Sequence, residues 1–299
     1  MPPRVFLIIL NYNKSLDTVK CLDSVAGLDY QNREIVIVDN NSKSPKVENL
    51  SSLIEARTGL KLLANAKNLG YSGGNNVGIK YALEHGADYV FILNPDTAIE
   101  KGSLSKLIEA AESDPKIGII GPAINEGNRT IYGSKISWLK SELTHSFVVT
   151  PSNKYSILDT DRYITGAAIL IKREVIEKIG LLDESYFLYF EDADYCLRAS
   201  RAGFNLAIVP QAKVTHVGSA STGSLGSALL LRYHYRNAHL FNWKNGPLLI
   251  KFALPFWSLF IIMKQLVKII FWAQRREISR TITVGVVDFY REKFGKIND

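Results

Sequence analysis

A regular alternation of apolar runs and amphipathic segments over the first 120 residues constrains the fold of this chain most strongly. The apolar runs are uninterrupted, which is typical of strands buried on both faces of a sheet. We expect these strands at residues 5–10, 34–38, 60–63, 89–93 and 117–120. Segments with helical spacing separate them, at residues 15–27, 73–85 and 101–112. Because strands that alternate with helices form a mostly parallel sheet with helices on both faces, the sequence predicts an α/β fold.

The rest of the chain divides into two parts. Residues 123–160 are less regular and are interpreted as a variable, substrate-facing insertion, after which a strand at 164–171 and helices at about 173–179 and 192–202 resume the pattern. From about Leu229 the sequence becomes helical, aromatic and apolar. We therefore predict one domain over residues 1–228, with halves at about 1–122 and 123–228, and a helical C-terminal region over 229–299.

The positive charge lies in this C-terminal region. Residues 229–299 contain 12 Lys and Arg against 4 Asp and Glu, a net charge of +8, whereas residues 1–228 carry a net charge of −1. A charge confined to one end favours an anionic surface as its partner over nucleic acid wrapped by the whole protein.

Two features indicate a cytoplasmic protein. Cys21 and Cys196 are far apart inside helix-like patterns, which argues for reduced thiols rather than a disulfide. The apolar run at residues 5–10 is too short for the core of a signal peptide.

The apolar segment 247–273 indicates contact with a membrane. Its longest uncharged run, residues 252–263, has 12 residues, whereas a spanning helix needs roughly 20. Lysines, arginines and the rings of Trp257 and Trp272 flank the apolar patches. A helix lying in the plane of the membrane fits this pattern better than a span. A buried helical pair that covers the core or forms a dimer interface is the alternative, and homo-oligomerisation stays open.

Residues 186–194 combine four aromatic side chains and a leucine with three carboxylates, Glu191, Asp192 and Asp194. Carboxylates avoid apolar surroundings unless they are paired, hydrogen-bonded or metal-bound, and neighbouring negative charges raise each other's pKa. The segment is therefore a candidate for acid–base or metal chemistry. The alternative is a solvated helix start, where acidic residues are favoured.

Polar clusters follow three of the predicted strands. In an open α/β sheet, ligands bind beyond the carboxyl ends of the strands, so these clusters are expected to share one crevice. They are Asn11-Tyr12-Asn13, Asp39-Asn40-Asn41 and Asn94-Pro95-Asp96. The glycine-rich segment 70–78 lacks a phosphate-loop motif, but it places backbone amides and asparagines at a helix start, which suits an anion.

A diphosphate ligand would bring a divalent cation, which prefers oxygen ligands from one or two carboxylates and the phosphates. Asp96 is well placed for that role. His216 ends a short predicted strand, where a lone histidine is more often a core or surface residue, although imidazole does join manganese in mixed sites.

Taken in order, these motifs resemble the family 2 inverting glycosyltransferases of GT-A fold, in particular the rhamnosyltransferase-type members that build surface polysaccharides. The matching pieces are residues 9–13, 36–42, 68–76, 93–96, 166–168, 190–194 and 216–218. The resemblance covers roughly residues 4–220, and Asn94 replaces the first acid of the family's Asp-x-Asp motif.

The resemblance implies roles for individual residues. Asp192 would be the general base, with Glu191 as its helper, and Asp96 and His216 would hold Mg²⁺ or Mn²⁺. Asp194 is expected to be structural, pairing with Arg198. The nucleotide-sugar site would be lined by Asn11, Tyr12, Asn13, Asp39, Asn68, Gly74, Asn75, Asn94, Asp96 and Gly166.

The resulting hypothesis is an enzyme that moves a sugar from a nucleotide-diphosphate donor, dTDP-rhamnose or a UDP-sugar, to a hydroxyl of a lipid-linked or polysaccharide acceptor. It would act at the cytoplasmic face of the inner membrane. One alternative is a non-catalytic nucleotide-sugar-binding subunit. Another is a sugar nucleotidyltransferase, but that class would have a glycine- and arginine-rich loop directly after the first strand, where this chain has residues 11–14.

Overall fold

The computed structural model describes residues 1–43, 50–55, 57–147, 154–216 and 228–297. Val217 and Gly218 of the motif that begins at His216, and residues 148–153 of the predicted insertion, lie outside these ranges.

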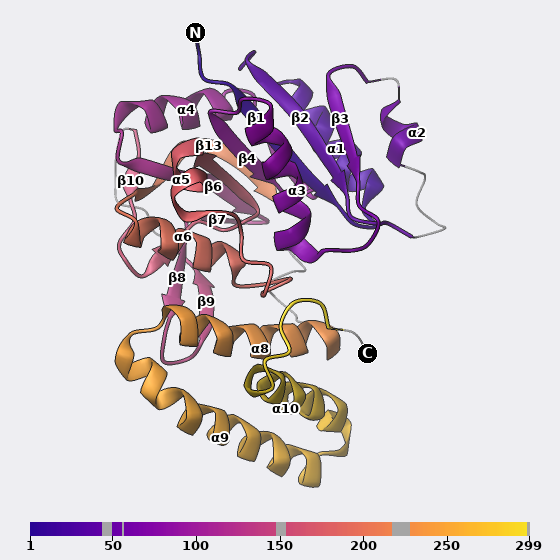
Figure 1. Ribbon diagram of the computed structural model, residues 1–299, viewed down its shortest axis with the longest axis vertical. Helices are drawn as coiled ribbons and strands as arrows, with labels where there is room; N and C mark the ends of the chain where they lie inside the picture. Colours follow the sequence, from indigo (N-terminus) through magenta and orange to yellow (C-terminus); the bar gives the residue numbers. More distant parts are fainter. Residues whose placement is uncertain (44–49, 56, 148–153, 217–227, 298–299) are drawn as a thin grey trace.

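The chain folds around one mixed sheet, as the alternating pattern predicts (Figure 1). The strand order is β10-β13-β6-β12-β4-β1-β2-β3, with β5 beside β13 and β7 beside β6. Strands β3, β2, β1 and β4 are parallel to one another, whereas β12 is antiparallel to both β4 and β6. The strands are β1 (Val5–Asn11), β2 (Arg33–Asp39), β3 (Leu60–Ala64), β4 (Tyr89–Leu93), β5 (Thr97–Ile99), β6 (Ile117–Glu126), β7 (Arg129–Ile131), β10 (Ser156–Ile157), β12 (Ala168–Lys172) and β13 (Asn205–His216).

Helices cover both faces of this sheet because side chains alternate along each buried strand. Phe6 and Ile8 of β1 join the core beneath α3, α5 and α6. Leu7 and Ile9 join the opposite core, beneath α1 and α4. The helices are α1 (Ser15–Ala26), α2 (Leu50–Ile54), α3 (Gly70–Glu84), α4 (Ser103–Ser113), α5 (Arg173–Ile179) and α6 (Glu191–Arg201).

Two segments differ from the sequence-based expectation, and a third follows it in finer detail. The strand expected at 164–171 begins only at Ala168, because the backbone of Gly166 bonds to side chains instead of a neighbouring strand. His216 ends a strand of 12 residues, β13, which continues past a shift of register beside β6. The predicted insertion is largely β-structure, and its β8 (Ser134–Ser137) and β9 (Glu142–His145) form a small second sheet with β11 (Arg162–Tyr163).

The C-terminal region forms a layer of helices at one end of the molecule (Figure 1). It consists of α8 (Ala228–Asn245), α9 (Leu248–Phe271), the short η1 (Ala273–Arg275) and α10 (Arg276–Tyr290). Helix α9 buries one stripe, and most of its other large apolar side chains are exposed. A buried helical pair, the alternative predicted from the sequence, therefore accounts for the buried stripe of α9 but not for its exposed apolar side chains.

The sequence pattern disfavours a membrane span because the longest uncharged run in 247–273 has 12 residues. The helix itself is longer than this run. Helix α9 continues through Pro255 and has 24 residues, so by length and composition it is long and apolar enough to cross a membrane. Only 22% of its most apolar window is buried.

Candidate active site at the carboxyl edge of the sheet

The strand ends bring the predicted polar clusters to one edge. Asn11 and Asp39 are register partners at the ends of β1 and β2. The backbone N–H of Asn94, directly after β4, donates to the carbonyl oxygen of Ala167 at 2.9 Å. His216 pairs with Thr97, one residue after Asp96. This edge of the sheet is thus built from residues far apart in the sequence.

Asn11 and Asp39 form one hydrogen-bonded unit. The buried Nδ2 of Asn11 donates to Asp39 Oδ1 (2.8 Å) and to Ser42 Oγ (3.0 Å), and Ser42 Oγ donates to Asp39 Oδ1 (2.6 Å). Asn13 has a φ of 56°, and its Oδ1 accepts from the backbone N–H of Lys43 (2.8 Å). Tyr12 is exposed. Asn11 therefore positions the carboxylate of Asp39, whereas Tyr12 has a ring free to cover a ligand.

The glycine-rich start of α3 is tied to the end of β2. Asn68 Oδ1 accepts from Asn40 Nδ2 (3.0 Å) and from the backbone N–H of Gly70 (2.8 Å). Gly74 lies against β1, since a Cβ there would be 2.4 Å from Leu10 Cδ1. Asn75 donates to the carbonyl of Tyr71, and its buried Oδ1 has no partner among the described residues. Close packing against Leu10 thus explains the glycine at position 74. Asn75 Oδ1 is an acceptor without a hydrogen bond from the described residues.

Asp96 lies between two cationic side chains. Its Oδ2 accepts from Lys14 Nζ (2.8 Å), and its Oδ1 is 3.2 Å from His216 Nε2. Burial raises the pKa of Asp96, but hydrogen bonds from His216 and Lys14 outweigh burial and lower that pKa to about 2. Burial lowers the pKa of His216, yet hydrogen bonds to Asp96 and to Glu126 (2.7 Å) raise it overall. Asp96 is therefore ionised at neutral pH and faces positive charge.

Within the described ranges, no group of three or more His, Cys, Asp or Glu side chains is arranged to hold a metal ion. Asp96 Oδ1 and His216 Nε2 nevertheless make a fitting pair of ligands, one hard oxygen and one imidazole. A cation here would replace the His216–Asp96 contact and would need further oxygen ligands from a diphosphate.

Glu191 and Asp192 begin α6 and differ in their surroundings. Asp192 is partly exposed, and its carboxylate accepts from the backbone N–H groups of Gly166 (2.9 Å) and Ala193 (2.8 Å). Burial raises the pKa of Asp192, although these hydrogen bonds oppose the shift. Burial and the charge of Asp192 raise the pKa of Glu191 well above its usual range, and Glu191 Oε2 has no partner among the described residues. The pKa values of both carboxyl groups are therefore raised, and that of Glu191 more strongly.

Tyr71 contacts Gly166, the residue whose backbone N–H bonds to Asp192. Its hydroxyl donates to the carbonyl oxygen of Gly166 at 2.6 Å, and a Cβ on Gly166 would lie 2.6 Å from that hydroxyl. Burial raises the pKa of Tyr71, and the charges of Glu191, Asp192 and Asp96 raise it further. All three carboxylates therefore lie within electrostatic range of this one hydroxyl.

The turn that leads into α6 is strained. Phe187, Tyr189 and Phe190 have φ of 61°, 71° and 74°, a left-handed region that costs bulky residues about 1–3 kcal/mol each. Two fully buried residues of α8 hold the turn. Asn237 Nδ2 donates to the carbonyl oxygens of residues 186 (2.6 Å), 188 (2.7 Å) and 189 (3.3 Å). Arg236 donates to the carbonyl of residue 186 (3.2 Å) and to those of residues 293 and 295 near the C-terminus.

Asp194 is structural, as its spacing from Arg198 predicts. Its Oδ2 accepts from Arg198 Nε at 2.8 Å, and its Oδ1 accepts from Asn245 Nδ2 of α8 at 2.7 Å. The three acids of this segment thus have three different surroundings.

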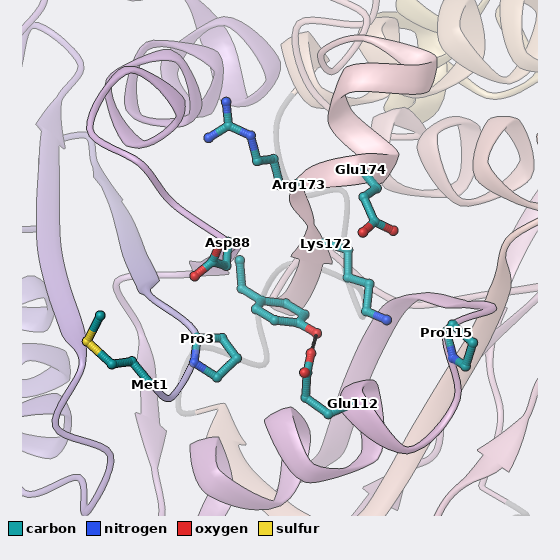
Figure 2. Close-up of a pocket in the computed structure, with 9 residues that line it drawn as sticks. Met1, Pro3, Asp88, Glu112, Pro115, Lys172, Arg173 and Glu174 are labelled. Atoms are coloured by element: carbon teal, nitrogen blue, oxygen red, sulfur yellow. Dashed lines mark hydrogen bonds between the residues drawn. The ribbon is translucent and has the colours of Figure 1, made fainter.

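A pocket of about 460 Å³ opens at the opposite edge of the sheet (Figure 2). It lies beside the first residue of β4, Tyr89, whose hydroxyl donates to Glu112, and beside Lys172 at the end of antiparallel β12. None of the predicted site residues lines it. The concentration of polar side chains, rather than the size of a cavity, identifies the candidate site.

Comparison with known proteins places this geometry in a family. Residues 6–180 match the glycosyl transferase family 2 domain. The chain belongs to glycosyl transferase family 2. It is therefore a glycosyltransferase, and the matched region includes the ends of β1, β2 and β4 and Gly166, but not Asp192 or His216.

Several named relatives of this glycosyltransferase transfer hexoses or rhamnose. A dTDP-rhamnosyl transferase of Shigella flexneri is 26% identical over 261 residues, 84% of each chain. A low-salt glycan biosynthesis hexosyltransferase of Haloferax volcanii is 28% identical over 78% of this chain and 74% of its own. An N-acetylglucosaminyl-diphospho-decaprenol L-rhamnosyltransferase of Mycobacterium tuberculosis is 26% identical over 72% of this chain and 78% of its own.

Solved structures share the GT-A fold. GalNAc-T7 with UDP, GalNAc and Mn²⁺ superposes with a TM-score of 0.64 at 18% identity, over 78% of this chain and 47% of its own. A mannosyltransferase of Pyrobaculum calidifontis with GDP-Man and Mn²⁺ gives 0.57 at 15% identity, over 98% and 88%. These likenesses show the fold of the chain.

Several residues that contact the site were not among the predicted site residues. Lys14 and Glu126 contact Asp96 and His216, and Tyr71 contacts Gly166. Arg236 and Asn237 lie in a region predicted to be an appendage. Only Lys14, directly after the first polar cluster, and Tyr71, inside the glycine-rich segment, had a position that pointed to the site.

We predict that Asn237→Leu loosens the turn before Glu191. The change leaves buried carbonyl oxygens without a donor, which costs about 1–3 kcal/mol. The free energy of unfolding should fall by about that amount, and hydrogen exchange of the amides at 186–190 should accelerate. Asn128→Leu, at an exposed turn, is the control and should change neither. Unchanged exchange at 186–190 in the Asn237 variant would contradict the assignment.

The pKa of Glu191 leads to a pH-dependent stability. The unfolded chain releases this proton near pH 4.5, whereas the folded protein retains it to higher pH, so the wild type loses stability as pH rises above 4.5. Glu191→Gln removes that loss. The melting temperatures of variant and wild type should agree below pH 4.5, and the variant should melt at the higher temperature above it. The exposed Glu109→Gln should show no such trend, and a constant difference for Glu191→Gln would count against the buried carboxyl.

Proposed function

We propose that this glycosyltransferase moves a sugar, with inversion, from a nucleotide-diphosphate sugar to a hydroxyl of a lipid-linked or polysaccharide acceptor. The observation that carries the proposal is the placement of two unlike acidic groups at one edge of the sheet. Asp96 contacts Lys14 and His216, whereas Asp192 is partly exposed and accepts from the backbone N–H of Gly166. The named relatives favour dTDP-rhamnose or a UDP-sugar as the donor.

The nucleotide would lie over the ends of β1 and β2. Asp39, held by Asn11 and Ser42, accepts hydrogen bonds from the base, and the exposed ring of Tyr12 covers it. Asn13, Asn68, Gly74, Asn75, Asn94 and Gly166 complete the walls of this site or support them. The start of α3 directs backbone N–H groups toward the diphosphate.

Asp192 acts as the base in a single in-line displacement. The acceptor hydroxyl loses its proton to the carboxylate of Asp192 while its oxygen bonds to the anomeric carbon, and the bond from that carbon to the diphosphate oxygen breaks. The N–H groups of Gly166 and Ala193 hold the carboxylate in place. Glu191, with its raised pKa, keeps a proton beside Asp192 and so avoids a second negative charge.

The leaving diphosphate gains negative charge. Asp96 and His216 would hold a divalent cation, Mg²⁺ or Mn²⁺, which supplies electrostatic stabilisation of that charge when bound. Lys14 Nζ, 2.8 Å from Asp96, supplies a further positive charge at this place.

The C-terminal region would place the enzyme on the cytoplasmic face of the membrane. Helix α9 exposes apolar side chains along its length, including Phe252, Phe256, Phe260 and Ile270, and exposed Lys264, Arg275 and Arg276 accompany them. We propose that residues 1–228 perform the transfer and that 229–299 contact an anionic lipid surface in the plane of the membrane.

Two predictions test the transfer chemistry, and the first concerns the base. Asp192→Asn should lower turnover by about 10²–10⁴-fold, the contribution of a positioned base. Donor binding, measured by calorimetry, should be unchanged because Asp192 does not line the nucleotide pocket. The exposed Asp159→Asn is the control. Near-normal turnover of Asp192→Asn would overturn the role, and absent turnover in the wild type with a panel of donors would favour a non-catalytic subunit.

The second concerns the cation. Asp96→Asn should weaken binding of Mn²⁺ to the donor-bound protein by about 10-fold or more, measured by electron paramagnetic resonance. His216→Gln should weaken it as well, and Asp159→Asn should not. Equal Mn²⁺ affinity in the wild type and in both site variants would exclude these ligands.

Membrane contact is tested by sedimentation with anionic vesicles at low salt. Each basic residue near such a surface contributes about 1 kcal/mol, so reversing the charges of Lys264, Arg275 and Arg276 together should reduce binding by on the order of 10²-fold or more. Reversal of the exposed Lys20, Lys80 and Lys116 is the matched control. If the wild type does not bind, α9 is better explained as a dimer interface.

A further inference from the structure

A second pocket lies between the small sheet and the C-terminal helices. It has a volume of about 290 Å³, and its walls come from the β8–β9 turn, α8 and α9. The side chains that define it are Trp138, Leu139, Asn242, Ile250, Ala253 and Trp257. Apart from Asn242 and Ser141, the lining is hydrophobic, and no charged side chain takes part in it. A ligand of this pocket therefore has a hydrocarbon part and no net charge at that point.

Two buried polar atoms in this lining have no hydrogen-bond partner among the described residues, Asn242 Oδ1 and Trp257 Nε1. Asn242 is 2% exposed. Its Nδ2 is already used, because it donates to Ser141 Oγ at 2.6 Å and to the carbonyl of Trp138 at 3.4 Å. Leaving such atoms unpaired costs stability. One acceptor and one donor without charge suit hydroxyl groups, which both donate and accept.

The pocket is connected to the candidate active site by aromatic contacts. Trp138 stacks on Phe241 with ring centroids 5.3 Å apart, and Phe241 contacts Phe190 at 5.5 Å. Phe190 directly precedes Glu191. On its other side the pocket is bounded by α9, where Phe256 is both a lining residue and 77% exposed. The pocket thus lies between the apolar outer surface of α9 and the layer that carries the acids.

We propose that this pocket binds the acceptor where its hydrocarbon chain meets its first hydroxyl-bearing group, as in a glycolipid. The inference rests on the proposed function for the identity of the acceptor. The chain fills the apolar lining, and hydroxyl groups pair with Asn242 Oδ1 and Trp257 Nε1. A phospholipid headgroup fits less well, because the lining offers a phosphate no cation.

The direct test uses decyl β-glucoside, a hydrocarbon chain attached to a sugar, below its micelle concentration and with the full-length protein. Calorimetry should detect binding, and both glucose without the chain and decanol without the sugar should bind more weakly. Ala253→Trp, at an exposed lining position, fills the pocket and should weaken binding at least about 10-fold. Val267→Trp, exposed on the same helix but outside the pocket, should bind as the wild type does.

Three results would overturn the proposal. The first is that Ala253→Trp binds decyl glucoside as tightly as the wild type does. The second is that glucose binds as tightly as decyl glucoside. The third is that Ala253→Trp and Val267→Trp weaken binding equally. Vesicle sedimentation separates this pocket from the membrane surface, since Ala253→Trp should still sediment with anionic vesicles; selective loss of sedimentation would assign the pocket to membrane contact instead. The measurement involves no sugar transfer, so failure of the proposed activity would leave the binding result to be judged by itself.

Discussion

The hydrogen bonds from Arg236 and Asn237 to the turn before α6 are the interaction on which the rest of the site depends. Three aromatic residues of that turn have left-handed backbone angles, which persist only where the surroundings fix them. Apolar packing cannot satisfy the buried carbonyl oxygens of such a turn, so the donors must be polar and themselves buried. Because both donors belong to α8, the helices after residue 228 are structurally part of the site, even where they differ in composition from the sheet domain.

The carboxyl groups at this edge of the sheet have different electrostatic surroundings. Burial raises the pKa of Asp96, Glu191 and Asp192 alike, yet the overall shift is downward for Asp96 and upward for the other two. Cationic hydrogen-bond donors surround Asp96, whereas backbone amides and another acid surround Asp192. Environments that move the pKa values of neighbouring carboxyl groups apart are a general way to give such groups different chemical roles.

The sequence predicts those features of the structure that depend on interactions between residues close together in the chain. The buried strands, the helices that separate them and the Asp194–Arg198 pair four residues apart all follow from periodicity or short spacing. The strand expected from residue 164 was wrong at its start because Gly166 serves Tyr71 and Asp192 instead of a sheet. Lys14, Glu126 and Asn237 were missed because their partners are between 48 and 90 residues away along the chain. Periodicity and short motifs in a single sequence carry no information about contacts at that separation. The resemblance of the ordered motifs to a family does relate residues that are so far apart.

The same reasoning decides how α9 is best understood. By length the helix has what a membrane span requires, but Ile250, Leu254, Ser258 and Ile261 are buried at helical spacing against its neighbours. Ser258 Oγ lies 2.8 Å from the hydroxyl of Tyr290, and Gly285 lets α10 approach the backbone of α8 closely. A spanning α9 would have to give up this stripe, and α10 and α8 would lose the packing that supports Arg236 and Asn237. An in-plane helix keeps the stripe and offers only its outer face to lipid. The proposed in-plane contact is therefore compatible with the packing that supports the turn before Glu191 and Asp192.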